Sequence, residues 1–305
     1  MNFDIQRKRS AHTTDCISTK NENTNLNFIN SLGVFSKYSK YPNSEKGEQI
    51  LTEYLNVDKE TFVLGFGSES LIRRLFFLLD YESIQILEHS YEMAFYYNKV
   101  LNKTIFINSL HFETEFEFEN ISKIGGDVLY LVNPHCPTGV FYTDEQIKFY
   151  SSVFKYVIID AAYSNPLDKS FLKLSNVIYI KTFSKLGGVP GIRLGYAVGP
   201  KHIIQRLHCL RDSYEIIADS IDYLSFICDN SHLILDHIFE MNECYKLLKN
   251  QHDGYSICCA NFATFDSDKF KGKTFWIKNT PFTRVTLTDK INYENLYSRK
   301  WSERS

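Results

Sequence analysis

A lysine and an arginine eight residues apart mark the stretch of this sequence that is best suited to chemistry. Lys185 and Arg193 lie within 177–199, which consists of a short apolar run, a glycine-rich loop and a second apolar run. The hydroxyls of Thr182 and Ser184 stand beside the lysine. Together these groups can hold a phosphate and still leave the lysine amine free to react with an aldehyde. Taken alone, the stretch fits a strand, a turn and a strand with ordinary solvated charges equally well, so the rest of the chain must decide.

A second candidate for phosphate binding is a glycine turn between a short strand and an apolar helix. The sequence predicts a strand at 61–64, the run Gly-Phe-Gly-Ser-Glu at 65–69, and a helix over 71–79. This order directs backbone N–H groups toward a phosphate. It is not the dinucleotide fingerprint, because Ser70 stands where the third glycine belongs and no ribose-binding acid is evident. A plain tight turn into a buried helix explains the run equally well by itself.

Other polar residues directly follow predicted strands. The run Asn-Pro-His-Cys-Pro-Thr-Gly at 133–139 follows the strand 127–132, and Asp-Ala-Ala-Tyr at 160–163 follows the strand 156–159. In an open sheet with parallel strands, ligands bind at the carboxyl ends of the strands. We therefore expect these side chains to gather at one edge of a sheet.

Between residues 61 and 199 short apolar strands alternate with helices. This rhythm is typical of an open, mostly parallel sheet with helices on both faces. The remaining strands are expected at 83–87, 104–107 and twice inside 177–199; further helices are expected at 44–55 with Ser44 as cap, after Tyr91 through Val100, and after the cap Thr143.

After residue 200 the pattern changes to that of a second, smaller α+β unit. Helices are expected at 201–210 and, as one long element, at 219–249. Short strands are expected within 255–266 and 274–287.

Composition narrows the possible partners and compartment. The 305 residues are 44% hydrophobic and 23% charged, with a net charge of -2, which gives no reason to expect nucleic acid or an anionic membrane as partner. The seven cysteines, an odd number, have no zinc-ligand spacing, so we expect free thiols in a reducing cytoplasm and no metal. The polar start is no secretory signal, and no apolar run approaches the ~20 residues of a membrane helix.

Taken together, the motifs resemble the fold-type I pyridoxal-phosphate enzymes, specifically the class I/II aminotransferases and their histidinol-phosphate aminotransferase branch. The resemblance runs from about residue 21 to residue 296 and is most specific at 133–139, at 160–163, and at Ser184-Lys185 with Arg193. It implies an α/β large domain at 40–205, in which helices sandwich a mostly parallel mixed sheet. It also implies an N-terminal segment at 1–39 that packs with a shortened α+β small domain at 206–305.

The resemblance assigns chemical roles to five residues around the cofactor, pyridoxal 5'-phosphate. Lys185 matches the Schiff-base lysine, whose freed amine also moves the proton between substrate and cofactor carbons. Asp160 matches the carboxylate that keeps the pyridine nitrogen protonated, so that the ring can accept electrons. Tyr163 and Asn133 match the groups that bond the ring hydroxyl, and Tyr91 matches the aromatic ring that stacks on the cofactor face.

The resemblance also assigns the phosphate and the substrate. Tyr41 resembles a tyrosine that reaches the phosphate of the neighbouring subunit, which implies a homodimer with shared sites. Arg284 matches the arginine that holds the substrate carboxylate, and Asn23 lies in a segment that closes over the substrate. The phosphate binders within the subunit are Gly67, Ser68 and Glu69 through the backbone, with Thr182, Ser184 and Arg193.

Departures from the family fall on the substrate side. Only sixteen residues separate Phe265 from Phe282, where the family carries a fuller helix and strand. A shortened small domain suggests a more open site, and we hypothesise a bulkier or carrier-linked amine. His135 and Cys136 replace the commoner polar pair of the asparagine-proline motif, and we interpret His135 as a structural loop residue.

These roles imply a cytoplasmic aminotransferase that passes an amino group between an amino acid or related amine and a 2-oxo acid. A decarboxylase on the same scaffold is the first alternative, because the same lysine, aspartate and arginine serve both reactions. The second is a cofactor-binding or regulatory module without activity; the intact Lys185, Asp160 and Arg193 disfavour it.

Overall fold

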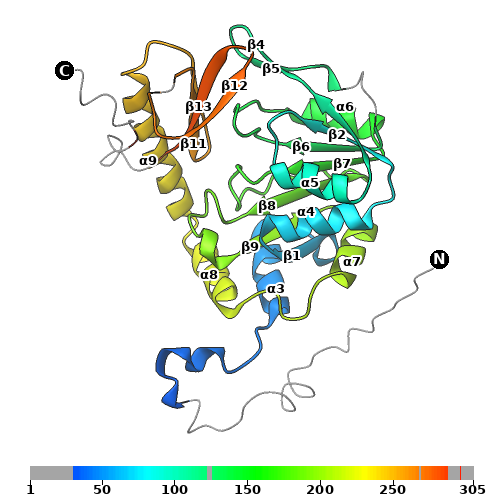
Figure 1. Cartoon of the computed structure of the whole chain (residues 1–305). Coiled ribbons are helices and arrows are strands. Elements are labelled where there is room, and N and C mark those ends of the chain that lie inside the picture. Colours follow the sequence, from blue (N-terminus) through cyan, green and yellow to red (C-terminus); the bar gives the residue numbers. More distant parts are fainter. Residues whose placement is uncertain (1–29, 122–125, 268, 288–295, 297–305) are drawn as a thin grey trace.

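A seven-stranded mixed sheet forms the centre of the computed structural model, which describes residues 30–121, 126–267, 269–287 and 296 (Figure 1). The strand order is β1-β9-β8-β7-β6-β2-β3, and β9 alone runs against its neighbours. The strands are β1 (Phe62–Phe66), β2 (Ser83–Leu87), β3 (Thr104–Asn108), β6 (Val128–Val132), β7 (Tyr156–Asp160), β8 (Val177–Thr182) and β9 (Leu194–Val198).

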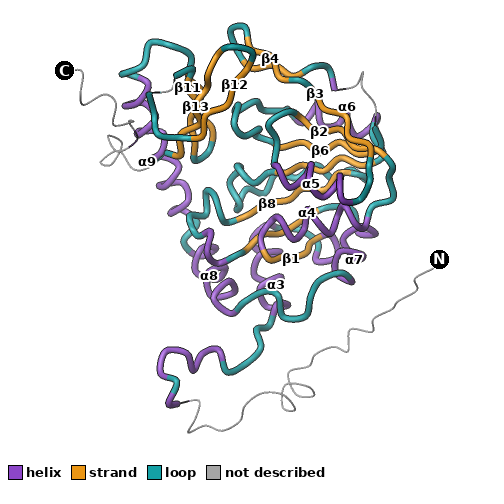
Figure 2. The backbone as a smooth tube through the Cα atoms, in the orientation of Figure 1, coloured by secondary structure: helices purple, strands orange, loops and turns teal. Residues whose placement is uncertain are grey.

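Helices cover both faces of this sheet, which explains why its central strands are mostly apolar. Every residue of β6 and β8 is buried, as expected for strands enclosed on two sides. Side chains of α4 (Gly67–Leu78), α5 (Glu92–Val100) and α7 (Lys201–Cys209) pack with one face. α3 (Ser44–Leu55) and α6 (Asp144–Val153) pack on the other, and Figure 2 shows the strands between the helices. The predicted sandwiched, mostly parallel mixed sheet is confirmed.

The helix caps show how local sequence sets these boundaries. α6 begins at the predicted cap, Thr143, which forms a reciprocal capping box with Gln146. α3 is capped one residue earlier than predicted: the Asn43 side chain accepts from the backbone N–H groups of Glu45 and Lys46. Either residue type suits a cap, so the sequence alone did not distinguish Asn43 from Ser44.

The long helix predicted at 219–249 is wrong, because the chain forms two helices there. α8 (Ala218–Asp229) ends at Asn230, whose backbone N–H and side-chain amide both donate to the carbonyl of Phe226. α9 (His232–Lys249) then begins as a separate helix. The Asn230 side chain competes with the backbone for a carbonyl at the end of the first helix.

A four-stranded antiparallel sheet forms the smaller unit, beside α9 (Figure 1). Its order is β10-β11-β13-β12, which confirms the short strands expected after residue 255. A two-stranded ribbon that was not predicted packs its phenylalanines against β12 and β13. The strands are β10 (Ser256–Cys259), β11 (Phe262–Phe265), β12 (Lys273–Ile277) and β13 (Thr280–Thr286), and the ribbon is β4 (Leu110–Phe112) with β5 (Phe116–Phe118).

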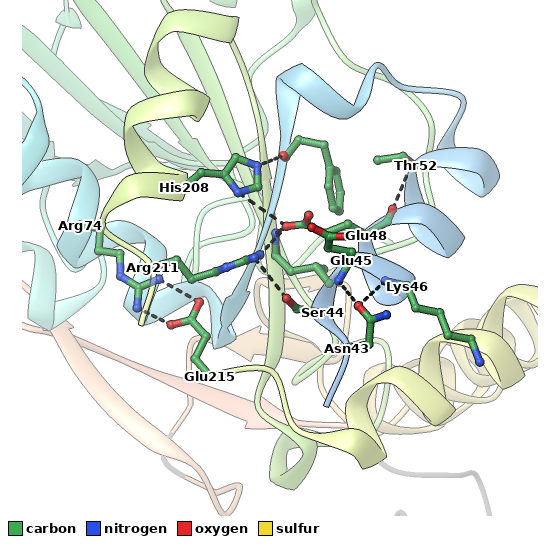
Figure 3. A network of polar contacts seen from close by, with 12 residues as sticks. Asn43, Ser44, Glu45, Lys46, Glu48, Thr52, Arg74, His208, Arg211 and Glu215 are labelled. Atoms are coloured by element: carbon green, nitrogen blue, oxygen red, sulfur yellow. Dashed lines mark hydrogen bonds and ion pairs between the residues drawn. The ribbon is translucent and has the colours of Figure 1, made fainter. Parts of the chain in front are cut away.

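A buried polar network joins α3 to the segment after α7 (Figure 3). Glu48, which is 0% exposed, accepts from the guanidinium of Arg211, and the ring of His208 lies 3.8 Å from the same carboxylate oxygen. In the same region, the guanidinium of Arg74 in α4 donates hydrogen bonds to both carboxylate oxygens of Glu215. These pairs hold α3 and α4 against the connection from α7 to α8.

The division at residues 39/40 and 205/206 remains a proposal. One hydrophobic cluster includes Leu51 of α3, Leu224 of α8 and Phe265 of β11, so the core is continuous across the second boundary. Short 3-10 turns lie at Gly33–Tyr38, Lys59–Thr61 and Pro190–Ile192. Of the helices in the described residues, none combines the length and apolar character needed to cross a membrane.

Candidate active site

A cavity of about 600 Å³ lies at the carboxyl edge of the large sheet. It is lined by residues that directly follow four of the strands: Ser68 after β1, Tyr91 after β2, Tyr163 after β7 and Ser184 after β8. Arg284 of β13 closes the cavity from the smaller unit. The structure thus gathers at one edge the polar residues that the sequence placed after separate strands.

The reversed direction of β9 brings Arg193 to this edge. Because β9 is antiparallel to both β1 and β8, its first residue lies where its neighbours end. Arg193 directly precedes β9 and holds a left-handed backbone conformation, with φ 55° and ψ 49°, which turns the chain from the glycine-rich loop into the strand.

Arg193 shares one end of the cavity with hydroxyls and the start of α4. Its guanidinium donates to the carbonyl of Pro190 at 3.1 Å. Gly67 has a φ of +73°, which favours glycine, and a Cβ there would lie 2.7 Å from Arg193 Nη2 and displace the guanidinium from its close approach to the start of α4. Ser68, Thr182 and Ser184 line the same cavity. A helix N-terminus, two or three hydroxyls and a guanidinium form a suitable cradle for a phosphate.

Lys185 projects into the cavity beside Tyr163. Its Nζ lies 5.3 Å from the centroid of the Tyr163 ring. The charge of Lys185 also acts on Asp160, which lines the same cavity. The amine therefore shares the cavity with the phosphate cradle and the carboxylate.

Asp160, the last residue of β7, is 4% exposed. Burial raises the pKa of its carboxyl group, while a hydrogen bond from the Tyr130 hydroxyl, another from the N–H of Ala162 and the charge of Lys185 lower it. The Tyr130 hydroxyl donates to Oδ2 and the Ala162 N–H donates to Oδ1 at 3.1 Å. The carboxylate is held in one orientation and retains lone pairs for a cationic ligand.

Tyr91 and Glu69 lie together on one wall of the cavity. Burial and the neighbouring Glu69 carboxylate raise the pKa of the Tyr91 hydroxyl. Tyr97 donates to Glu69 Oε1 at 2.8 Å, so the Glu69 side chain is engaged by tyrosines. Its backbone N–H remains at the first turn of α4, as the prediction of a backbone role requires.

Arg284 and Tyr163 meet on the side of the cavity that faces the smaller unit. Arg284 Nη1 donates to the Tyr163 hydroxyl at 3.3 Å and to the Cys136 sulfur at 3.2 Å. Its Nε is buried and has no hydrogen-bond partner among the described residues. Burial is the main cause that raises the pKa of the Tyr163 hydroxyl, and it keeps this phenol a neutral donor. An anionic group is the ligand that such an arginine lacks.

The asparagine-proline motif places Cys136 rather than Asn133 at the cavity. Asn133 Oδ1 accepts from the N–H of Tyr142 and its Nδ2 donates to the carbonyl of Tyr142, both at 2.9 Å. Asn133 is not among the residues that line the cavity, whereas Cys136 and Pro137 are. In this structure the Asn133 side chain is bonded to Tyr142 instead of facing the cavity. Its contact with a ring hydroxyl stays a prediction.

His135 has a structural position, as interpreted from the sequence. It is 0% exposed, its Nδ1 lies 2.8 Å from the Thr138 hydroxyl, and its Nε2 lies 3.3 Å from the Ser90 hydroxyl. Burial lowers the pKa of His135 to about 3, so the ring is neutral and bridges two loops.

Tyr41, a predicted contact of the cofactor phosphate, does not line the cavity of this chain. Tyr41 is 52% exposed and its ring stacks on Tyr214 at 4.2 Å between centroids. Asn23 lies outside the described residues.

Three residues of the site were not found from the sequence. Tyr130 lies inside a buried strand, and its strand partner Ile158 places it beside Asp160 only once β6 and β7 are paired. Cys136 stands out in the sequence as a replacement within the asparagine-proline motif, but nothing in the sequence assigns it a contact with the cavity. Lys273 lines the cavity directly opposite Arg284 in the register of β12 and β13, and no sequence signal marked it.

Comparisons with known proteins identify a family and a fold that this chain shares. A family model described as aminotransferase class I and II matches residues 6–253. The histidinol-phosphate aminotransferase of Sulfurimonas denitrificans is 29% identical over 64% of this chain, and the match spans 59% of that enzyme's length, less than two thirds.

Solved structures share the fold. The histidinol-phosphate aminotransferase of Clostridium acetobutylicum superposes with a TM-score of 0.71 and 19% identity, over 88% of this chain and 91% of that one. The enzyme of Sinorhizobium meliloti, solved in complex with pyridoxal-5'-phosphate, gives a TM-score of 0.66 and 17% identity over 80% of this chain and 72% of that one. The predicted resemblance and cofactor are confirmed at the level of the family.

The residues present fit this cofactor. The approach of Arg193 to Gly67, which a Cβ would block, forms a cradle for the phosphate. Asp160 offers a buried carboxylate that lacks a cation at hydrogen-bond distance among the described residues, as a protonated ring nitrogen requires. Lys185 lines the same cavity, with its amine near the ring of Tyr163.

Proposed function

We propose that this protein, which belongs to the aminotransferase class I and II family, transfers an amino group between an amino acid or related amine and a 2-oxo acid. Pyridoxal phosphate is the cofactor of this family. When bound, it supplies an aldehyde that bonds amines and a ring that withdraws electrons from the amine-bearing carbon. The observation that carries the proposal is the position of Lys185 in one cavity with Asp160, Arg193 and Arg284.

Four groups of the chain would hold the cofactor. Arg193 and the first turn of α4 bind the phosphate, with the hydroxyls of Thr182 and Ser184. Asp160 holds a proton on the ring nitrogen, because a buried carboxylate stabilises the cation it contacts. Tyr91 would cover one face of the ring, and Tyr163 would donate its phenolic proton to the ring hydroxyl.

Lys185 carries the chemical steps that belong to the chain. Its amine attaches the cofactor covalently until a substrate amine displaces it. With the cofactor bound, the freed amine beside Tyr163 would take a proton from the amine-bearing carbon of the substrate and deliver it to the carbon of the former aldehyde, on the other side of the nitrogen. Arg284 grips the substrate carboxylate, and this contact fixes which bond at that carbon is presented to the lysine.

Attachment of the cofactor provides the first test. The protein is incubated with pyridoxal phosphate, reduced with borohydride and digested, and the modified peptide is identified by mass. We expect modification at Lys185 alone. Lys185→Ala should abolish it, while the exposed Lys173→Ala serves as a matched control and should not change it. Label spread over surface lysines would overturn the proposal.

Product analysis separates the proposed reaction from the alternative. A panel of amino donors, including the histidinol phosphate named for the relatives, is offered with and without a 2-oxo acid. Formation of pyridoxamine phosphate supports amino transfer. Release of carbon dioxide without need for an oxo acid would instead establish a decarboxylase. If neither product forms, the binding module without activity is the remaining alternative.

We further propose a cytoplasmic homodimer in which Tyr41 serves the site of the second copy. Tyr41, Val34 and Phe35 are exposed to 52%, 80% and 65%, so apolar surface gathers near the start of the described chain. The six cysteines among the described residues are free thiols, as a reducing compartment permits. Sedimentation should give twice the mass of the chain, and Tyr41→Phe should weaken cofactor affinity several-fold without changing that mass. A monomer with full activity would overturn the shared site.

A further inference from the structure

Cys136 lies where the two substrate-side groups of the cavity meet. Its sulfur accepts a hydrogen bond from Arg284 Nη1 at 3.2 Å, and the Tyr163 hydroxyl lies 3.3 Å from the same nitrogen. The charge and hydrogen bonding of Cys136 also contribute to the raised pKa of Tyr163, after burial, and to that of Arg284. Sulfur, phenol and guanidinium therefore form one contact group at the cavity wall.

The loop that carries Cys136 is held in place from several sides. Asn133 at its start is bonded twice to the backbone of Tyr142. Gly139 at its end donates to the carbonyl of His135 at 2.7 Å. The Thr264 hydroxyl of β11 donates to the carbonyl of Pro137, which joins the loop to the smaller unit. A sulfur on such a loop offers a fixed acceptor to the neighbouring arginine.

This contact leaves one edge of the guanidinium for a ligand. Nη1 donates to the sulfur and to the phenol, whereas Nε is buried without a partner among the described residues. A carboxylate that bonds an arginine through two parallel N–H groups would satisfy Nε. An arginine held at Nη1 is already oriented for this ligand, so less side-chain freedom is lost when the ligand binds.

We propose that Cys136 is a positioning residue that orients Arg284 toward the carboxylate of the substrate. The proposal rests on the proposed function, since it concerns the arginine assigned to the substrate anion. The sulfur itself forms no bond with the substrate and takes no proton from it. Its effect is on binding of the anion rather than on the chemistry at Lys185.

Steady-state kinetics of the holoenzyme test this role, because a change at Cys136 should affect KM and leave kcat nearly unchanged. Cys136→Ala removes the acceptor, and we expect KM for the 2-oxo acid to rise about 10-fold with kcat nearly unchanged. Cys136→Ser keeps a small acceptor and should restore KM to within about 3-fold of the unchanged protein. Cys259→Ser is the matched control, because this half-buried thiol of β10 is not one of the two groups to which the Arg284 side chain donates, and it should leave KM unchanged.

Thiol alkylation gives a second measurement that needs no catalysis. The rates at Cys136 with iodoacetate and with iodoacetamide are compared by peptide mass, with the exposed Cys209 of the same molecule as reference. Arg284 attracts the anionic reagent, so the ratio of the two rates should be about 10-fold higher at Cys136 than at Cys209. Arg284→Gln should abolish the difference, and a 2-oxo acid should protect Cys136.

The outcomes separate this proposal from the one on which it rests. If Lys185 fails to attach the cofactor in the unchanged protein, the proposed function is overturned. If the cofactor attaches normally and Cys136→Ala has an unchanged KM, only the positioning role is overturned. Equal reagent preference at Cys136 and Cys209 would overturn the role as well, because the thiol would then lie outside the influence of Arg284.

Discussion

Two buried carboxylates of this molecule have similar exposure and different partners. Glu48 in α3 is 0% exposed and Asp160 at the end of β7 is 4% exposed. Glu48 accepts from the guanidinium of Arg211, and the ring of His208 lies 3.8 Å away (Figure 3). Asp160 accepts only from neutral donors, the Tyr130 hydroxyl and the N–H of Ala162, among the described residues.

From this difference we infer that Glu48 serves the fold and Asp160 serves the site. The charge of Glu48 is compensated by a cation of the same chain, and the pair joins α3 to the segment after α7. No cation of the described residues lies at hydrogen-bond distance from Asp160, although the charge of Lys185 acts on it, and burial raises the pKa of its carboxyl group. A buried charge without a hydrogen-bonded cation costs stability, and such groups are concentrated at functional sites. We propose that the ring nitrogen of the cofactor is the cation that pairs with Asp160.

Replacement of Asp160 should give the largest effect. It should lower activity and leave the stability of the fold nearly unchanged. Asp160→Asn keeps the shape of the side chain but cannot hold a proton on the ring nitrogen, so we expect kcat/KM to fall about 1,000-fold or more. The free energy of unfolding, measured in urea, should change by no more than about 1 kcal/mol, because no internal ion pair is broken. Activity within 10-fold of the unchanged enzyme would contradict the assigned role.

Replacement of Glu48 should reverse this result. Glu48→Gln leaves the buried charge of Arg211 without its partner, and we expect a loss of about 3 kcal/mol in the free energy of unfolding. The values of kcat and KM should stay close to those of the unchanged enzyme at a temperature where the variant is folded. Glu53→Gln, at an exposed position on the same helix, is the control and should cost no more than about 0.5 kcal/mol. A large loss of kcat in Glu48→Gln would mean that the network also shapes the cavity.

Much of the fold could be predicted because the large sheet is encoded locally. β2 has the bounds that its apolar run predicts, Ser83–Leu87, and β6 and β7 differ from prediction by one residue. The ribbon of β4 and β5 was missed because strands of three residues show no clear period, and contacts with β12 and β13 hold them. Tertiary contacts of this kind cannot be read from a short window of sequence.

For the candidate site, residues within contiguous motifs could be predicted and contacts between motifs could not. Lys185 and Arg193 belong to one stretch, and the sequence already paired them. Which residue of 133–139 faces the cavity depends on how Asn133 bonds Tyr142 and turns the loop, and this required the structure. Tyr130 reaches Asp160 only through the pairing of two strands.

A buried cation extends the comparison, because Lys181 is paired less completely than Arg211. Lys181 Nζ donates to the carbonyls of Asn165 and Asp168 at 3.2 and 3.0 Å and lies 3.6 Å from the Asp168 carboxylate. Burial lowers the pKa of Lys181 from 10.5 to about 8. Between these values the unfolded chain binds more protons than the folded protein, so this residue makes stability rise with pH.

Lys181→Met should remove that rise. We subtract the free energy of unfolding of the variant from that of the unchanged protein. Between pH 8 and pH 10 this difference should rise by roughly 2 kcal/mol. Urea unfolding at several pH values measures it, and the use of a difference cancels the titration of other groups. Lys173→Met, at an exposed position, should show no such trend. A difference independent of pH would mean that Lys181 is neutral or fully paired throughout.

Replacement of Tyr130 should give the smallest effect and should act through Asp160. The Tyr130 hydroxyl stabilises the charged form of the Asp160 carboxyl group, so its hydrogen bond lowers the pKa. Tyr130→Phe should raise that pKa, which moves the acid limb of the kcat/KM profile to higher pH and weakens cofactor affinity about 10-fold. Tyr196→Phe removes the hydroxyl of another fully buried tyrosine, which donates to the carbonyl of Pro166 at 2.6 Å, and should leave the acid limb in place. If both variants move the limb equally, the effect comes from general loosening of the core, and the contrast between a carboxylate tuned by neutral donors and one paired to an arginine loses its support.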